Sequence, residues 1–461
     1  MSETRKSMVR DLTGGSVVKQ LLIFAFPLFI SNSLQAVYNI VDMIVVGQWV
    51  GKEGMSAVSI GGDILHLITF LAMGFSSAGQ ILIAQHVGAK NFDAVRKTIG
   101  TLFTVLLSSS VVISVVCFFL RYNILHWLNT PDDAFDYAYH YTVTCVFGLF
   151  FIYGYNVVSA ILRGMGDSRR PFVFIAIAAI LNIILDILFV AVFDMKAFGA
   201  ALATVIGQGV SFIVSLIYLY RRRENFGFDF RPESFKPDRT ALGQLVSLGI
   251  PMAIQSAAVM TSKIILTAWI NAYGVVYSAL GGVYNKVNMV SGIVSNSFTA
   301  AGSTMVGQNL GAEKYERVPK ILRVVLVCGT AITLVFSAVI IFLPGPVFRA
   351  FTGDEDVLKV ASILIWPIVV NFFGSATRSV AFSLINGSGN TKLNLTVAII
   401  DGVISRIGIA ALLGFALGMD CLGFWYGDAI AGYVPFLVGS CYFLSGRWKT
   451  NRSISGPEQV D

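Results

Sequence analysis

Charged residues are scarce in this sequence of 461 residues, because Asp, Glu, Lys and Arg together make up only 13% of it. A soluble domain carries about a quarter charged residues. Hydrophobic residues make up 55%, and the mean hydropathy is +0.74. A chain with so little charge cannot cover itself with polar surface. The composition therefore excludes a soluble protein and predicts an integral membrane protein whose surroundings are a lipid bilayer.

Other absences narrow the function. The sequence has five cysteines, none with paired or metal-like spacing, so neither a disulfide framework nor a cysteine metal site is predicted. It has no phosphate-binding Walker loop, which argues against ATP coupling. The net charge of +7 does not require a nucleic acid partner, because membrane proteins concentrate Lys and Arg in their cytoplasmic loops.

Long apolar runs are abundant, and spanning a bilayer takes about twenty helical residues. The runs are continuously apolar and show no two-residue alternation, so they predict helices and not a barrel. They give an all-α integral membrane protein with about twelve transmembrane helices. The expected spans are 17–46, 56–86, 94–120, 138–162, 169–192, 198–220, 241–271, 277–308, 321–344, 358–385, 393–416 and 421–445.

The basic residues predict the orientation of these spans. With the amino terminus inside, most of the 33 Lys and Arg fall in cytoplasmic segments or at the span ends beside them. Both termini are therefore expected in the cytoplasm, in a multi-pass protein of the cell membrane.

An internal repeat divides the chain. Residues 78–97 read AGQILIAQHVGAKNFDAVRK and residues 301–320 read AGSTMVGQNLGAEKYERVPK, an offset of 223. Gly164 and Gly166 recur as Gly387 and Gly389. Two six-helix bundles related by a pseudo-twofold axis along the membrane normal are expected, an architecture suited to alternating access. The expected parts are an amino-terminal lobe (1–220), a cytoplasmic linker (221–240), a carboxy-terminal lobe (241–446) and a cytoplasmic tail (447–461).

Ionisable side chains at membrane depth are costly, which makes them functional candidates. Those away from the expected span ends are Asp42, Asp63, Asp186, Asp401, Asp428, Lys263, Lys286, Arg378 and Arg406. The first span also carries a polar stripe at helical spacing, formed by Gln35, Tyr38, Asn39 and Asp42.

Four residues of the first half form the strongest candidate site. Asn182 and Asp186 share one face of the fifth span, and Thr204 lies in a run of small residues on the sixth, where helices can approach closely. With Asp42 they supply oxygen ligands suited to a hard cation such as Na⁺, and two neighbouring carboxylates could hold a proton instead. The alternative is a buried structural network of hydrogen bonds.

The second half carries a different set of charges. Lys263 occupies the position that matches Asn39, Lys286 lies on the eighth span, and Asp401 and Arg406 share the eleventh. We expect a buried pair between Lys263 and Asp401, because buried charges usually find partners. Arg378 adds a further basic group. This set either handles substrate or protons, or holds the lobe together.

At these residues the sequence resembles the multidrug and toxic compound extrusion (MATE) family, in particular its prokaryotic DinF-like branch. The resemblance covers nearly the whole chain and is carried by Pro27, Asp42 and Gly47, by the Gly88-Ala89 loop and its repeat, and by the run from Arg163 through Gly164, Gly166, Asp167 and Pro171 to Asn182 and Asp186. It implies a secondary antiporter that exports bulky, often cationic amphipathic compounds in exchange for inward Na⁺ or H⁺, as a monomer and with no cofactor beyond the coupling ion. It also implies that Asp42, Asn182, Asp186 and Thr204 bind that ion. Many relatives carry a Glu on the seventh helix where this chain has Lys263, so a second cation site is not expected there and a less cationic substrate becomes conceivable.

Two rival functions remain open. A lipid-linked oligosaccharide flippase of the same superfamily would have to neutralise a pyrophosphate, for which Lys263, Lys286, Arg378 and Arg406 are available. An intramembrane aspartyl protease would use the GxGD sequence that ends at Asp167, together with the Tyr and Asp of Tyr426-Gly427-Asp428. Arg169 and Arg170 follow directly and place that Asp at the cytoplasmic boundary, so an enzyme is not expected.

Overall fold

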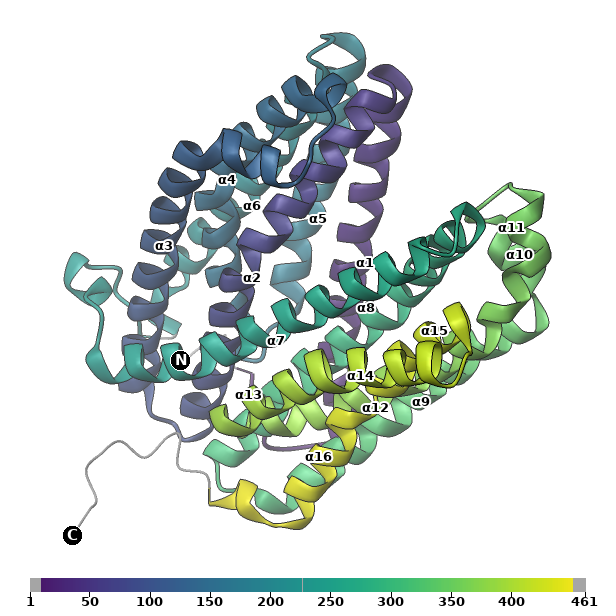
Figure 1. Ribbon diagram of the computed structural model, residues 1–461. Helices are drawn as coiled ribbons and strands as arrows, with labels where there is room; N and C mark the ends of the chain where they lie inside the picture. The colour runs from purple at the N-terminus through teal and green to yellow at the C-terminus, as the bar shows by residue number, and fades with distance from the viewer. Residues whose placement is uncertain (1–9, 226, 451–461) are drawn as a thin grey trace. The chain divides into compact units, whose positions relative to one another are not determined.

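Helices make up all the regular secondary structure in residues 10–225 and 227–450, which are the residues that this computed structural model describes. Six long helices account for the first half of the chain (Figure 1). They are α1 (Val17–Trp49), α2 (Lys52–Gly88), α3 (Phe92–Trp127), α4 (Asp132–Gly164), α5 (Arg169–Asp186) and α6 (Lys196–Arg221).

The second half contains the same number of spans, but several are interrupted. Its helices are α7 (Arg239–Asn271), α8 (Val275–Gly311), α9 (Val318–Phe342), α10 (Pro344–Arg349), α11 (Glu355–Val360), α12 (Ile365–Gly387), α13 (Thr391–Ile399), α14 (Arg406–Ala411), α15 (Asp420–Ala431) and α16 (Val434–Leu444). Each of the twelve expected spans coincides with one long helix or with a run of consecutive helices, so the predicted span count is confirmed.

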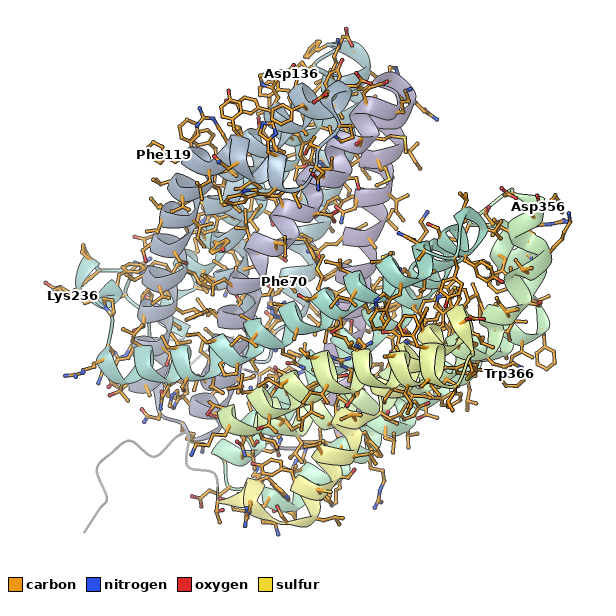
Figure 2. The ribbon with its side chains drawn as sticks, viewed as in Figure 1. Phe70, Phe119, Asp136, Lys236, Asp356 and Trp366 are labelled. Atoms are coloured by element: carbon orange, nitrogen blue, oxygen red, sulfur yellow. The ribbon has the colours of Figure 1, made fainter. Side chains whose placement is uncertain are left out.

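Among the described residues, eleven helical stretches are apolar and long enough to cross a membrane. The remaining expected span is α8, which is as long as α2, at 37 residues, but carries polar residues such as Asn285, Lys286 and Asn288 along its length. Large apolar side chains point outward from the helices, for example Phe119 with 72% of its surface exposed (Figure 2). Such exposure is expected where hydrocarbon surrounds the protein.

The repeat read from the sequence is visible in the packing of both halves. A Cβ atom on Gly164 would lie 2.7 Å from the carbonyl oxygen of Gln80, and one on Gly387 would lie 2.9 Å from that of Ser303. Ser303 is the residue that matches Gln80 in the internal repeat, so the same close helix contact recurs in each half. The two glycines that follow, Gly166 and Gly389, both adopt positive φ angles of 87° and 70°, a conformation that favours glycine.

The described chain divides into two compact units, each with its own helical core. The first unit contains Phe26–Gly249 and the described residues before Leu12, and the second contains Leu12–Ala25 and the chain from Ile250 onward. Both α1 and α7 therefore contribute to both units, and each changes unit within two residues of a proline, Pro27 or Pro251. A proline inside a helix removes a backbone donor, so both positions are natural bends.

Two expected spans contain wide helical turns of the π type. The fifth continues from α5 as Ile187–Val192, and the eleventh contains two such segments, Ile400–Ser405 and Leu412–Ala416, on either side of α14. Such turns are frequent at functional sites because they re-aim side chains and free backbone groups. Asp186 and Arg406 directly adjoin these segments, and Asp401 lies inside one.

Candidate functional sites

Three helices of the first unit bring the four predicted cation ligands into one region. Asp42 lies on α1, Asn182 and Asp186 on α5, and Thr204 on α6; the first three are buried. The side-chain amide of Asn182 donates a hydrogen bond to the hydroxyl of Thr204 over 3.3 Å. This contact is possible because α5 and α6 pack closely at Gly207, where a Cβ atom would lie 3.1 Å from the carbonyl oxygen of Ala178.

Several oxygens of this cluster lack a hydrogen-bond donor within the part of the chain that the structure describes. They are Oδ1 of Asp42, Oδ1 of Asn182 and both carboxylate oxygens of Asp186, all buried. The charge of Asp42 acts on that of Asp186, so the two carboxylates lie within electrostatic range of each other. Buried polar atoms are almost always paired, and each one left without a partner costs about 1–3 kcal/mol. The cluster is therefore a region of buried negative potential without compensating donors.

The rest of the predicted polar stripe on α1 is less enclosed. Gln35 and Tyr38 are half-buried, while Asn39 is exposed. Tyr38 lies against Gln208 of α6 and close to Asp42, which extends the polar region along α1. Asp63 of α2 is exposed and does not belong to the buried cluster.

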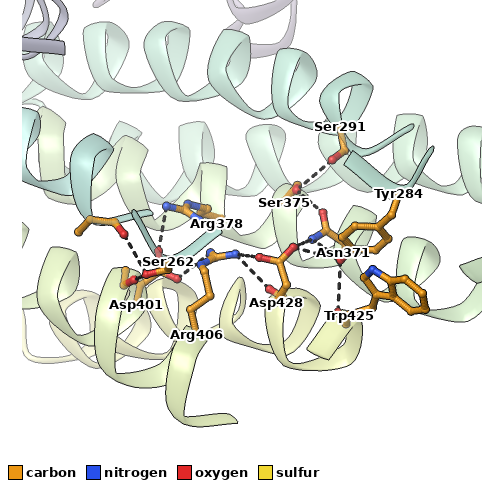
Figure 3. A network of polar contacts seen from close by, with 12 residues as sticks. Ser262, Tyr284, Ser291, Asn371, Ser375, Arg378, Asp401, Arg406, Trp425 and Asp428 are labelled. Carbon is orange, nitrogen blue, oxygen red and sulfur yellow. Dashed lines mark hydrogen bonds and ion pairs between the residues drawn. The ribbon is translucent and has the colours of Figure 1, made fainter. Parts of the chain in front are cut away.

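A second polar cluster lies inside the second unit, where four charged residues form a chain of ion pairs (Figure 3). A guanidinium nitrogen of Arg378 lies 2.8 Å from Asp401, and Arg406 donates to the other oxygen of Asp401 over 3.1 Å. Arg406 also donates to the carboxylate of Asp428. Arg406, Asp401 and Asp428 are almost completely buried, so their charges are compensated within the cluster.

Two close helix approaches position these charges. A Cβ atom on Gly427 of α15 would lie 2.3 Å from the Cα atom of Ala410, so α14 and α15 meet without intervening side chains and Arg406 reaches Asp428. A Cβ atom on Gly402, next to Asp401, would likewise collide with Ala258 of α7. The hydroxyl of Ser262 donates a hydrogen bond to the carbonyl oxygen of Gly402. The small residues thus set the positions of the large charged ones.

Neutral polar residues extend the cluster toward α8 and α12. The hydroxyl of Tyr284 and the amide of Asn371 both donate to Oδ2 of Asp428, over 3.1 Å and 3.4 Å. Ser375 donates to Asn371 over 3.5 Å and lies 3.2 Å from the hydroxyl of Ser291 (Figure 3). Asp428 is therefore held by donors from α8, α12 and α14 at once.

The expected pair between Lys263 and Asp401 is wrong. Asp401 is paired with Arg378 and Arg406, and the described residues provide no ion-pair partner for Lys263. The two arginines approach Asp401 from α12 and from the helix that carries it, which leaves no need for a third cation. Lys263 and Lys286 are both exposed, and Lys263 lines a cavity that also contains Asp428.

The sequence analysis named Asp428 as a charge at membrane depth and in the protease alternative but did not group it with Asp401 and Arg406, although it is a central member of this cluster. Helical spacing can relate only residues on one helix, and Asp428 meets its partners across three helices. The sequence offered one signal: the basic residues at membrane depth in this half outnumber Asp401, which indicates that a second buried carboxylate is needed to balance their charge.

The carboxylate of Asp167, the candidate protease residue, is committed to local contacts. It accepts hydrogen bonds from the backbone amides of Arg169 and Arg170 and forms an ion pair of 2.6 Å with the Arg170 guanidinium. Both oxygens of this carboxylate are therefore engaged by donors at the start of α5.

Buried polar clusters inside two repeated sets of membrane-spanning helices define a polytopic membrane transporter as the class of protein. The chain belongs to the MatE family, whose sequence pattern matches it twice, at residues 27–188 and 251–422. The two matches fall on the two halves of the repeat.

Relatives of similar length support this assignment. The "Probable multidrug resistance protein YoeA" of Bacillus subtilis is 28% identical over 93% of this chain and 94% of its own length. The "Probable multidrug resistance protein YpnP" of the same organism is 27% identical over 95% and 97%. The family and these relatives indicate a transporter and not an enzyme.

Solved structures show the same fold. One is described as "Reverse polarity of binding pocket suggests different function of a MOP superfamily transporter from Pyrococcus furiosus" and matches with a TM-score of 0.89 at 21% identity, over 97% of this chain and 100% of that one. At this identity the likeness establishes the arrangement of the helices and leaves the function to be argued from the residues of this chain.

Proposed function

We propose that this protein is a secondary antiporter that exports bulky amphipathic compounds in exchange for inward Na⁺ or H⁺. Relatives that match over more than nine-tenths of the chain are named multidrug resistance proteins, which supports export of small molecules. We further propose that it acts as a monomer in the cell membrane with both termini in the cytoplasm. The amino-terminal residues 1–9 and the tail residues 451–461 lie outside the described residues.

The observation that carries the proposal is the set of buried oxygens without donors on Asp42, Asn182 and Asp186. A cation supplies what these oxygens lack, because Na⁺ accepts carboxylate, amide and hydroxyl ligands together, and a proton shared between two carboxylates removes their repulsion. Thr204 completes the oxygen set through its contact with Asn182. The same atoms are poorly explained as a structural network, since such a network would satisfy them.

Coupling requires the cation to bind the outward-open and inward-open states with different affinity. The carboxylates of α1 and α5 can provide this difference, because α1 contains the bend at Pro27 and α5 ends in a wide turn directly after Asp186. A change in either helix would alter the distance between the two carboxylates and hence their affinity for the cation. Gln35, Tyr38 and Asn39 continue the polar face of α1 and are proposed to line the substrate path.

The test is gradient-driven efflux of a fluorescent substrate from proteoliposomes, with a Na⁺ gradient and a pH gradient imposed separately. Asp42→Asn keeps the size of the side chain and removes its charge, so the variant should insert normally and lose uphill transport under the gradient that drives the wild type. Asp63→Asn is the matched control, because Asp63 is an exposed carboxylate at membrane depth and should be dispensable. Uphill efflux at the normal rate by correctly folded Asp42→Asn protein would show that the site is assigned wrongly.

A further inference from the structure

The end of the first unit at which α5 begins and α6 ends carries a dense group of arginines. Residues 167–170 and 221–224 contain five arginines but only two acidic residues. One of the acids, Asp167, is already paired with Arg170. Three of the other arginines have no ion-pair partner among the described residues, and their side chains are exposed: Arg169, Arg221 and Arg222. These three, the arginine group, give this end an excess of positive charge.

The antiparallel packing of α5 and α6 brings these arginines together from two helices. The hydroxyl of Ser211 on α6 donates to the carbonyl oxygen of Phe174 on α5 over 3.1 Å. Further along α6, the centroid of the Tyr218 ring lies 5.7 Å from the central carbon of the Arg170 guanidinium. The charge of Arg222 acts on the same tyrosine, so Arg222 is close to it as well. The start of α5 therefore lies beside the end of α6.

Each of the two helices presents one exposed apolar stripe that ends at an arginine. On α5, large apolar side chains recur at helical spacing and continue the exposed face of Arg169: they are Val173, Ile177, Ile180 and Ile184. On α6, Ile213 and Ile217 are exposed, and Arg221 follows at the same spacing. Residues three or four apart lie on one face of a helix.

These stripes indicate where the arginine group stands relative to the bilayer. Exposed apolar side chains on membrane-spanning helices face the hydrocarbon chains of the lipids, and the polar residues at the helix ends face the head groups. The arginine group follows the last apolar residue of each stripe directly. It therefore stands at the level of the head groups, on the outer surface of the helix pair.

We propose that this surface binds an anionic phospholipid, with its phosphate on Arg169, Arg221 and Arg222 and its acyl chains along the apolar stripes of α5 and α6. Basic clusters directly beside a membrane-spanning helix attract acidic lipids. Arginine suits this role because its planar guanidinium can donate parallel hydrogen bonds to a phosphate. The lipid lies along the helices, so no enclosed cavity is required. The proposal is independent of the proposed antiport, since it concerns the surface that faces lipid and not the buried oxygen cluster.

The site can be tested by equilibrium binding to the full-length protein in micelles of dodecyl maltoside. The probes are phosphatidylglycerol and phosphatidylcholine with identical acyl chains and the same fluorophore on one chain, so that only the head group differs. Binding is followed by fluorescence anisotropy as a function of the mole fraction of probe in the micelles. The wild type should bind phosphatidylglycerol about tenfold or more tightly than phosphatidylcholine, which is the factor that a hydrogen bond between charged groups provides.

Substitution of the arginine group tests the residues. The triple variant Arg169→Gln, Arg221→Gln, Arg222→Gln should lose the preference for phosphatidylglycerol. Replacement of the same three residues by Lys should keep most of it, because the charge is retained. Equal affinity of the wild type for both lipids overturns the proposal, as does an undiminished preference in the Gln triple variant. If that variant elutes as an aggregate, the single variants Arg169→Gln and Arg222→Gln decide the question, and each should lower the preference severalfold.

The matched control removes three positive charges elsewhere in the first unit. The variant Arg96→Gln, Lys97→Gln, Arg231→Gln changes exposed residues that pair with Asp93 or Asp229, and it should keep the wild-type preference. An equal loss of preference in this control would show that only net charge attracts the lipid, which overturns the site. Glycerophosphoglycerol, the same head group without acyl chains, should not displace phosphatidylglycerol. Effective displacement would assign the arginines to a soluble anion and overturn the lipid assignment.

Discussion

Arg406 is the residue whose removal should be most damaging to the second unit. Its side chain is 3% exposed and forms ion pairs with Asp401 and Asp428, both almost fully buried. Replacement by Met keeps the length and the apolar stem but removes the ion-pair partner of Asp428 and leaves Asp401 paired with Arg378 alone. Breaking a buried ion pair by removing one partner costs about 3–5 kcal/mol, much of it from the charge left uncompensated.

For a unit of about 200 residues, each kcal/mol lowers the melting temperature by about 2–4 °C, so Arg406→Met should melt about 6–20 °C below the wild type. The buried free cysteines Cys117, Cys145 and Cys421 allow this to be followed in detergent with a thiol-reactive dye that fluoresces once they are exposed. Arg349→Met is the control. Arg349 pairs with Glu355 over 3.9 Å with 70% of its side chain exposed, and such a pair contributes at most about 1 kcal/mol.

The double variant Arg406→Met, Asp428→Asn tests the cause. Neutralising Asp428 removes the carboxylate that has lost its ion-pair partner, so the double variant should be more stable than Arg406→Met alone. Lys263→Met should lower the melting temperature much less than Arg406→Met, because Lys263 does not compensate Asp401. The reasoning about buried charge is refuted if Arg406→Met has the melting temperature of the wild type. It is also refuted if the double variant loses as much stability as Arg406→Met and Asp428→Asn lose in sum.

Three further predictions follow from the packing, the orientation and the cation site. Gly427→Ala should destabilise the protein by about 1–3 kcal/mol through overpacking against α14, whereas Gly408→Ala, with open space around it, should be neutral in the same dye assay. The side chains of Asp356 and Lys236 are both exposed (Figure 2). On a cysteine-free background, Asp356→Cys should react with an impermeant thiol reagent in intact cells and Lys236→Cys should not. The reverse result would invert the proposed orientation of the protein in the membrane. Thr204→Ala removes a neutral ligand only, so it should raise the cation concentration needed for half-maximal transport and leave the maximal rate nearly unchanged; complete loss of transport would contradict this.

The spans were predictable because their signal is strong and local. A run such as residues 94–120 contains no charged residue after Lys97, and no soluble alternative competes with a membrane helix there. The wide turns at Ile187–Val192 and Ile400–Ser405 were not predictable, because hydropathy averaged over a window does not register one extra residue in a helical turn. The polar α8 was identified as a span from its apolar stretches, although its composition alone falls short.

The candidate sites were predictable only where one helix carried the pattern. Asn182 and Asp186 could be placed on one face from their spacing. Asp42 and Thr204 lie on other helices and were grouped with them by their oxygen chemistry and by the family resemblance. No such rule links Arg406 to Asp428, since their contact depends on how closely two glycine-containing helices pack. The expected pair of Lys263 with Asp401 failed for the same reason: opposite charge predicts that a partner exists without identifying it.

The passage of α1 and α7 from one compact unit to the other has a consequence for how the chain could be divided. A cut within the linker would give two fragments of about half the protein each. The first fragment would lack Arg239–Gly249, which belongs to the first compact unit, and the second fragment would lack Leu12–Ala25, which belongs to the second compact unit. Neither fragment should fold alone, while co-expression should restore both because each supplies what the other misses.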